Sequence, residues 1–259
     1  MLEHLGRKTV EAVEEAGYLV ALLIESMFWI FFGPFYRQPV RVPSVFTQMM
    51  QIGIAAVPIV FILSFAIGVM LAIQGIHTLK TFGAESQVVM GIAFSVTREF
   101  GPLITSILIA GRSGSALAAR IGTMQVNQEI DALRVMGINP VRYLIAPALL
   151  AMLLMVPTLT FFSDLAGLLG GAVYTGIELG MTYDAYAIQS MDVLETDDIM
   201  QGLIKSVVFA IIIVMVGVVN GFEVKGGAEG VGRSTTRSVV MAISYIVIAD
   251  MIFTYFLNR

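Results

Sequence analysis

Residues 53–75 read GIAAVPIVFILSFAIGVMLAIQG and contain no charged side chain. An α-helix needs about 20 predominantly apolar residues to cross the hydrocarbon core of a bilayer, so this stretch predicts a membrane-spanning helix. A strand of a membrane barrel would instead alternate over about ten residues. The whole chain agrees, since 57% of its 259 residues are hydrophobic and 13% are charged. Roughly a quarter are charged in an average soluble protein, so the sequence predicts an all-α membrane protein.

Four further apolar stretches have the length of a transmembrane helix, which makes five predicted spans in one domain. They are residues 87–111, 143–174, 199–222 and 239–257. We therefore assign residues 46–259 to a five-helix transmembrane domain and residues 1–45 to a separate N-terminal region.

The N-terminal region contains one ambiguous apolar stretch, residues 18–36 (YLVALLIESMFWIFFGPFY). Basic residues stand on both sides of it: Arg7, Lys8, Arg37 and Arg41. Both ends therefore prefer the cytoplasmic side of a membrane. An amphipathic or re-entrant helix at the inner interface, with Trp29 and Tyr36 at headgroup depth, satisfies this preference better than a sixth span, which is the alternative.

The segments between the spans differ in charge. Residues 112–142 and 223–238 are rich in Lys and Arg, whereas residues 76–86 have only Lys80. Residues 175–198 have no basic residue and six acidic ones: Glu178, Asp184, Asp192, Glu195, Asp197 and Asp198. The positive-inside rule then predicts a cytoplasmic N-terminus and a C-terminus on the opposite side of the membrane.

The sequence lacks the residues that several kinds of binding site and active site require. The chain has no G-x-x-x-x-G-K-[ST] phosphate loop, and its glycine-rich segment 226–232 (GGAEGVG) lacks the lysine and hydroxyl of one. It has no cysteine, and its two histidines, His4 and His77, are far apart in sequence. We expect no ATP site, no metal site, no catalytic residues and no bound cofactor in this chain, and no nucleic-acid partner.

Charged residues inside the spans are candidates for function. Arg98, Glu99, Lys205 and Asp250 lie within apolar runs, where an ionised group costs about 2.5–3.5 kcal/mol. Lys205 and Asp250 both fall in the outer half of the membrane, so we expect them to pair, with Arg98 and Glu99 joining the network. The network either holds helices together or reorganises during transport, and both interpretations stay open. Asp164 lies in a span long enough to carry it to the outer interface.

Small residues recur every four positions along the second span and beyond it. They are Ser106, Ala110, Gly114, Ala118 and Gly122. Such a face permits close approach of two helix backbones, so we expect it to pack against another helix rather than to bind a ligand. The pattern also predicts that the second span continues as a helix into the cytoplasm.

Residues 124–137 (MQVNQEIDALRVMG) predict a short amphipathic helix in the cytoplasm. Its apolar stripe comprises Val126, Ile130, Leu133 and Met136. Its polar positions are Glu129, Asp131 and Arg134. A helix of this kind either lies on the membrane or binds a partner. The mixed charge favours docking to a cytoplasmic partner.

The stretch REFGPLITSILIAGRSGSALAARIGTMQVNQEIDALRVMGINP at 98–140 closely resembles the MlaE/YrbE family of permeases. A second match is LIKSVVFAIIIVMVGVVNGFEVKGGAEGVGRSTTRSVV at 203–240. The likeness covers nearly the whole chain and is weakest in residues 1–45 and in the acidic segment 175–198. That segment departs from the family pattern in being acidic and free of basic residues. We therefore expect its contacts with an outer partner to differ from those of its relatives.

The resemblance implies a permease subunit of an ABC transporter in the bacterial inner membrane. Such a subunit forms a homodimer, docks on two cytoplasmic ATPases that bind ATP and Mg²⁺, and meets a periplasmic Mce-domain protein. It moves phospholipid and so supports outer-membrane lipid asymmetry. The segment around Glu129 and Arg134 would be the coupling helix. The lipid cavity would involve Leu71, Gln74, Ile76, Leu79 and Phe82.

Two other classes of function compete with this interpretation. An ion-coupled secondary transporter would use Glu99 or Asp250 as a proton site, because carboxylates within spans often mark proton relays. A purely structural membrane scaffold is the other. No inverted repeat is visible, and an ion-coupled transporter leaves the docking helix unexplained, so that class is disfavoured. Copurification of an ATPase would separate the ABC permease from both other classes.

Overall fold

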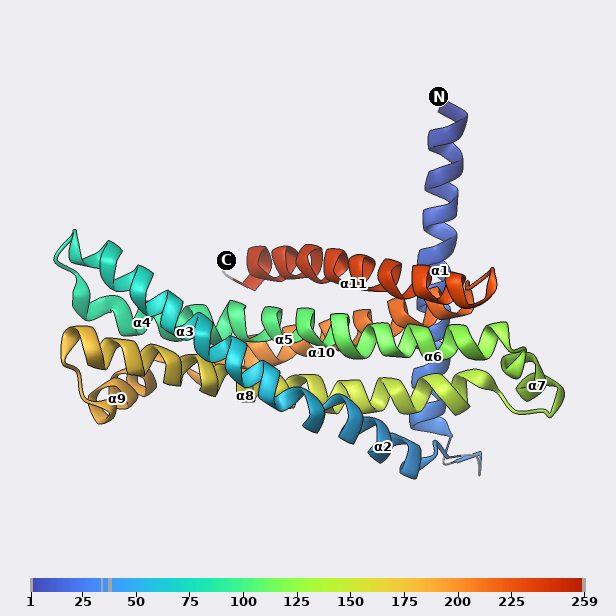
Figure 1. The fold of residues 1–259 in the computed structure, drawn as a ribbon, viewed down its shortest axis with the longest axis horizontal. Helices are drawn as coiled ribbons and strands as arrows, with labels where there is room; N and C mark the ends of the chain where they lie inside the picture. Colours follow the sequence, from blue (N-terminus) through green and yellow to red (C-terminus); the bar gives the residue numbers. More distant parts are fainter. Residues whose placement is uncertain (1, 34, 37–38, 258–259) are drawn as a thin grey trace. The chain divides into compact units, whose positions relative to one another are not determined.

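The computed structural model describes residues 2–33, 35–36 and 39–257. Within these ranges the chain is helical and contains no strand (Figure 1). Arg37 lies outside the described residues, as do the side chains of Arg7 and Lys8. The all-α prediction is confirmed for the described part of the chain.

The helices follow one another with short connections, and some are interrupted by 3₁₀ or π turns, labelled η. The first half of the chain forms α1 (Leu2–Phe32), α2 (Val42–Ile52), η1 (Ile54–Ala56), α3 (Val57–Lys80), η2 (Glu85–Gln87), α4 (Val88–Ser95), η3 (Val96–Phe100), α5 (Gly101–Ile109), η4 (Ala110–Gly114) and α6 (Ser115–Val126). The second half forms α7 (Glu129–Val135), η5 (Val141–Ile145), α8 (Ala146–Leu179), α9 (Tyr183–Val193), α10 (Thr196–Phe222) and α11 (Gly227–Leu257).

Five helical runs in the described residues are long and apolar enough to cross a membrane. They are Val42–Lys80, Glu85–Val126, Val141–Leu179, Thr196–Phe222 and Gly227–Leu257. The count of five confirms the sequence prediction. Each run extends beyond its predicted span, because apolar composition marks only the part of a helix that lies in hydrocarbon.

Helix α1 is longer than the predicted interfacial helix, because it begins at Leu2 instead of residue 18. Its apolar part, Gly17–Phe32, has fewer than 18 residues. At a rise of about 1.5 Å per residue it is shorter than the roughly 30 Å hydrocarbon core. This length agrees better with an interfacial or re-entrant helix than with a sixth span, and its position in a membrane stays a prediction.

The chain forms two compact units. Unit 1 comprises Met1–Gln48, Gly111–Met152 and Ile211–Ala242. Unit 2 comprises Met49–Ala110, Leu153–Ala210 and Ile243–Arg259. Because both units draw on several separate stretches, neither corresponds to the predicted division at residue 45, which stays a prediction.

In unit 1, α6 packs against α10 along the predicted stripe of small residues. A Cβ atom added to Gly217 would lie 3.1 Å from the carbonyl oxygen of Gly114. One added to Gly221 would lie 3.1 Å from the carbonyl oxygen of Ala118. Gly122 continues this contact at Val224, and Ser106 and Ala110, which belong to unit 2, are also buried. The small residues therefore let backbones approach closely.

Also in unit 1, polar contacts attach α1 to the segment that follows α7. The Asn139 side-chain amide donates to Glu25 Oε1 at 2.8 Å. The Arg142 guanidinium lies 5.4 Å from the centre of the Trp29 ring, a cation–π contact. These contacts fix the apolar part of α1 beside the start of α8.

In unit 2, α3 and α8 pack closely against each other. A Cβ atom at Gly68 would overlap the carbonyl oxygen of Gly167, and one at Gly170 would overlap that of Phe65. Near them, the Ser64 and Ser163 hydroxyls share a hydrogen bond of 2.6 Å. The two backbones therefore touch, which only residues without a side chain permit.

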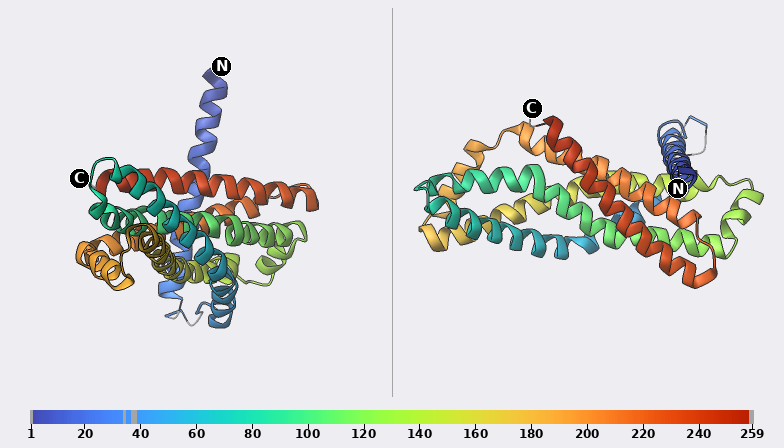
Figure 2. Two further views of the ribbon diagram at one scale, coloured as in Figure 1. Left: turned by 60° about the vertical axis from the view of Figure 1, so that its left-hand side comes forward. Right: turned by 90° about the horizontal axis from the view of Figure 1, so that it is seen from above.

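The acidic segment 175–198 is not simply a loop, since it contains α9 (Figure 2). Figure 2 shows this helix beside α4. The Thr182 hydroxyl caps α9 by accepting a hydrogen bond from the Ala185 N–H at 3.3 Å. Tyr186 is buried against Gly171, and burial raises the pKa of the Tyr186 phenol to about 12.

Candidate functional site

Unit 2 contains a pocket between α3 and α4 of about 320 Å³. Its walls come from Leu71, Gln74, Gly75, Thr78 and Leu79 of α3 and from Val88, Gly91, Ile92 and Ser95 of α4. Most of the wall is apolar, and three side chains offer polar groups. A mainly apolar pocket with a few polar groups is typical of a site for a small amphiphilic molecule or part of one.

Three of the five residues proposed for a lipid cavity line this pocket: Leu71, Gln74 and Leu79. Ile76 does not line it; this side chain is 3% exposed and packs in the apolar core that α3 forms with α4. Phe82 is 78% exposed, lies beyond the end of α3 and does not line the pocket. The helical repeat of 3.6 residues explains the division, since positions 71, 74–75 and 78–79 share one face of α3.

A second feature of unit 2 is an ionic cluster around Lys205, whose side chain is 1% exposed. Its Nζ atom lies 2.8 Å from Glu99 Oε2 and 3.0 Å from Asp250 Oδ1. It also donates to Thr254 Oγ1 at 3.1 Å, and the Thr254 hydroxyl donates to Glu99 at 3.0 Å. The expected Lys205–Asp250 pair is present, and Glu99 joins it as expected.

The sequence around Pro102 explains a fourth contact of Lys205. Proline has no N–H, so Pro102 cannot bond to the carbonyl four residues earlier, which belongs to Arg98. The helix forms the π turn η3 at this point, and the Arg98 carbonyl accepts a hydrogen bond from Lys205 Nζ at 3.1 Å. The π turn thus leaves the Arg98 carbonyl free to accept a hydrogen bond from the buried ammonium group of Lys205.

The side chain of Arg98 has a different partner from the one expected. Its Nε donates to Asp198 Oδ1 at 2.7 Å, and its Nη2 contacts the same oxygen. Asp198 is buried in the first turn of α10, and its other oxygen accepts from the Glu195 N–H at 2.9 Å. Sequence reasoning missed Asp198 because it counted this residue only as part of an acidic loop.

Asp164 is buried inside unit 2, and its depth in a membrane stays a prediction. Asp164 is 5% exposed, and its Oδ1 fills the space where a side chain at Gly101 would stand. The residue therefore faces the interior of unit 2.

The predicted docking helix differs from expectation in two ways. Residues 124–137 do not form one helix, because α6 ends at Val126, Gln128 adopts a left-handed φ of 59°, and α7 covers only Glu129–Val135. Only part of the predicted stripe faces outward, since Val126 is 38% exposed and Met136 is 64% exposed. Ile130 is fully buried and Leu133 is 8% exposed, so both pack inside unit 1.

Residues at the end of α7 are available to a partner. Val135 is 89% exposed and Met136 is 64% exposed, and both are apolar. Arg134 and Asp131 form an exposed ion pair of 3.2 Å on the same turn. The surface of α7 thus combines exposed apolar side chains with charge, a composition that suits a protein partner.

Five membrane-length helices, an amphiphile-sized pocket and a buried ionic cluster together define a polytopic membrane permease. The family described as Permease MlaE matches residues 45–256 of the chain. The chain belongs to this family, as the permease subunit of an ABC transporter and not its ATPase.

Relatives from distant organisms match over most of the chain. A probable ABC transporter permease of Rickettsia prowazekii is 32% identical over 98% of this chain and 96% of its own length. The intermembrane phospholipid transport system permease protein MlaE of Haemophilus influenzae is 32% identical over 82% of each chain. The chloroplastic protein TRIGALACTOSYLDIACYLGLYCEROL 1 of Arabidopsis thaliana is 35% identical over 81% of this chain and 60% of its own length.

Proposed function

We propose that this permease moves phospholipid between the bacterial inner membrane and a periplasmic Mce-domain carrier, and thereby supports outer-membrane lipid asymmetry. It works as a homodimer on two cytoplasmic ATPases that bind ATP and Mg²⁺, with its N-terminus in the cytoplasm and its C-terminus in the periplasm. The pocket between α3 and α4 carries the proposal, because its apolar walls and few polar groups suit a lipid. The name of the Haemophilus relative supports the substrate class.

The mechanism requires a pocket whose affinity for lipid changes during the ATPase cycle. A partner shifts a conformational equilibrium only by as much as it prefers one state. ATP-driven closure of the ATPases, received at α7, therefore has to favour a state in which the pocket is smaller. Lipid is abundant in the bilayer, so the work of the cycle is extraction and not capture.

Filling the pocket tests the lipid site. A Cβ atom at Gly75 would lie 3.7 Å from Val88 Cγ1, so alanine fits there whereas the indole of Gly75→Trp occupies the pocket. We expect Gly75→Trp to lower ATP-dependent lipid transfer to the carrier in proteoliposomes by about tenfold or more. Met90→Trp is the matched control, since Met90 is exposed on α4 and does not line the pocket. Transfer by Gly75→Trp equal to wild type would exclude this pocket.

The docking role of α7 is tested at Val135. We expect Val135→Asp to reduce copurification of the ATPase by about tenfold, because a charge replaces an exposed apolar contact at the interface. Leu133 is unsuitable for this test, since it is buried and an arginine there would disturb the packing of unit 1. Ala228→Asp, an exposed change on α11, serves as the control. Equal loss in both variants would argue against specific docking at α7.

The secondary-transport alternative is favoured by one observation, that two carboxylates share the single ammonium of Lys205. It predicts lipid or ion flux that follows a pH gradient without ATP. The ABC interpretation predicts flux that stops when the ATPase is removed, whatever the gradient. The same proteoliposomes distinguish the two.

A further inference from the structure

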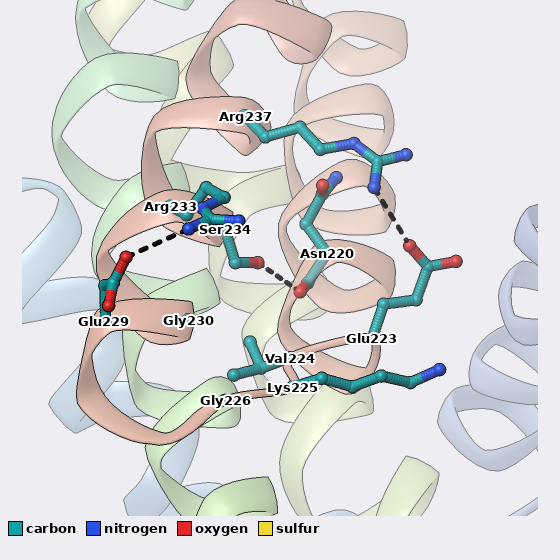
Figure 3. A pocket seen from close by; sticks show the side chains of 10 residues that line it. All are labelled: Asn220, Glu223, Val224, Lys225, Gly226, Glu229, Gly230, Arg233, Ser234 and Arg237. Carbon is teal, nitrogen blue, oxygen red and sulfur yellow. Dashed lines mark hydrogen bonds and ion pairs between the residues drawn. The ribbon is translucent and has the colours of Figure 1, made fainter.

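Unit 1 contains a second pocket, where α10 ends and α11 begins (Figure 3). Its volume is about 300 Å³. Its lining comprises Asn220, Glu223, Val224, Lys225, Gly226, Glu229, Gly230, Arg233, Ser234 and Arg237. Unlike the pocket between α3 and α4, it is surrounded mostly by charged and polar side chains.

The charges in this pocket leave one cation available. Arg233 pairs with Glu229 at 3.0 Å, and Arg237 pairs with Glu223 at 3.5 Å. Figure 3 shows Lys225 apart from both pairs. Lys225 is exposed, and in the described part of the chain no carboxylate lies within ion-pair distance of it. The pocket therefore attracts a small anionic group.

The backbone adds further donors to the pocket. Gly226 and Gly227 have φ values of 90° and 70°, and they turn the chain so that α11 begins at the pocket. The first N–H groups of a helix have no partner within it and carry a partial positive charge. Gly230 is packed so tightly against the Lys225 carbonyl that a Cβ atom would overlap it. The turn thus holds Lys225 next to the start of α11.

One wall of the pocket contains a buried hydrogen-bond acceptor, on Asn220, that receives no hydrogen bond from the described residues. Asn220 is 2% exposed, and its amide nitrogen donates to the Val216 carbonyl at 2.9 Å. Its Oδ1 has no donor among the described residues. Figure 3 shows its side chain between Ser234 and Glu223, beneath Arg237. A buried amide oxygen without a donor is suited to a hydroxyl or ammonium group of a ligand.

The position of the pocket along the helices matches the headgroup layer of a membrane. The apolar run of α10 ends at Phe222, three residues before Lys225. The apolar run of α11 begins at Val239, so Arg237 and Arg233 lie roughly 3 and 9 Å before it along the axis. The headgroup region adds about 5–7 Å on each side of the hydrocarbon core, so Arg237 falls within it and Arg233 lies just beyond its edge. Basic pockets between transmembrane helices at this depth are suited to phosphate headgroups.

We propose that this pocket binds the phosphate group of a phospholipid headgroup, with Lys225 and the first N–H groups of α11 on the phosphate. A hydroxyl or ammonium group of the same headgroup donates a hydrogen bond to Asn220 Oδ1. The site is separate from the pocket between α3 and α4 and does not depend on the transport function proposed above. It holds a lipid at the edge of the bilayer.

Lipid binding by the full chain in detergent tests the proposal, with native mass spectrometry as the readout and dioleoylphosphatidylglycerol as the probe. We expect Lys225→Gln to weaken the tightest binding step about tenfold, the effect of losing one charge-assisted contact. Lys225→Arg should restore it, because the charge returns. Lys80→Gln, the matched control, changes an exposed lysine of unit 2 and should leave binding unchanged.

The competing probes separate the possible sources of the phosphate. Dioleoylglycerol has the same chains without phosphate, and we expect wild type and Lys225→Gln to bind it equally. If millimolar inorganic phosphate displaces the lipid fully, with the same dependence on Lys225, the phosphate site stands and its source is free phosphate. Equal binding of phosphatidylglycerol by wild type and Lys225→Gln overturns the proposal. The proposal is also overturned if Lys225→Gln binds lipid as wild type does but no longer copurifies with the ATPase. That result would assign the pocket to a protein interface.

Discussion

Replacing Lys205 by methionine is expected to destabilise the permease by about 3 kcal/mol, the largest effect of any single change in the ionic cluster. Methionine preserves the apolar stem of lysine and removes only the ammonium group. Glu99 and Asp250 would then face each other without a cation, at 32% and 13% exposure. The estimate is at the low end of the range for breaking a buried pair, because water still reaches Glu99.

The free energy of unfolding in detergent, measured by chemical denaturation, checks this expectation. Lys80→Met is the control, since Lys80 is 60% exposed and should change stability by less than about 1 kcal/mol. The triple variant Lys205→Met, Glu99→Gln and Asp250→Asn should regain most of the loss, because no charge is left unpaired. A Lys205→Met protein as stable as wild type would contradict the contacts described for Lys205.

The triple variant also decides between the two interpretations of the cluster. If it is stable and still transfers lipid, the cluster only holds η3, α10 and α11 together. If it is stable and inactive, the charges take part in the transport cycle. Stability and transfer therefore have to be measured on the same preparation.

Replacing Gly68 by alanine is expected to destabilise unit 2 by about 3 kcal/mol, although it adds one methyl group. The added Cβ atom would overlap the carbonyl oxygen of Gly167 on α8. Backbone atoms cannot move aside as the end of a side chain does, so α3 and α8 would have to separate along their contact. That separation also disturbs the hydrogen bond between Ser64 and Ser163.

A second glycine on α3 provides the matched control for this change. Gly75→Ala meets only Val88 at an ordinary distance of 3.7 Å and should be neutral or stabilising by up to about 1 kcal/mol, as alanine favours a helix. Thermal unfolding of both variants in the same detergent gives the comparison. Equal melting temperatures would mean that α3 and α8 do not touch at Gly68.

Much of the architecture was predictable from the sequence because a bilayer acts on local composition. A run such as 53–75 has to cross hydrocarbon or remain insoluble, so five runs gave five spans. The spacing of Gly114, Ala118 and Gly122 predicted a close helix contact for a similarly local reason, since residues four apart share one face. The charges at Glu99, Lys205 and Asp250 stood out because they interrupt apolar runs.

The structure corrected predictions that depended on the rotation of a helix about its axis. Five residues were proposed together for a cavity (Leu71, Gln74, Ile76, Leu79 and Phe82), but Ile76 packs in the core and does not line the pocket. Ile130 and Leu133 were expected to face a partner, and they face their own unit. An amphipathic pattern shows that one side of a helix is apolar, but it does not show whether the protein itself or a partner covers that side.

The sequence by itself determined the class of protein, the number of its spans and the presence of charges within them, because each follows from neighbouring residues and the solvent around them. Only the tertiary structure decided which charges meet. Arg98 bonds to Asp198 across 100 positions of sequence, while its carbonyl, freed by Pro102, turns to Lys205. Such pairings depend on the distance and rotation between helices, and these are set by the packing of all side chains together.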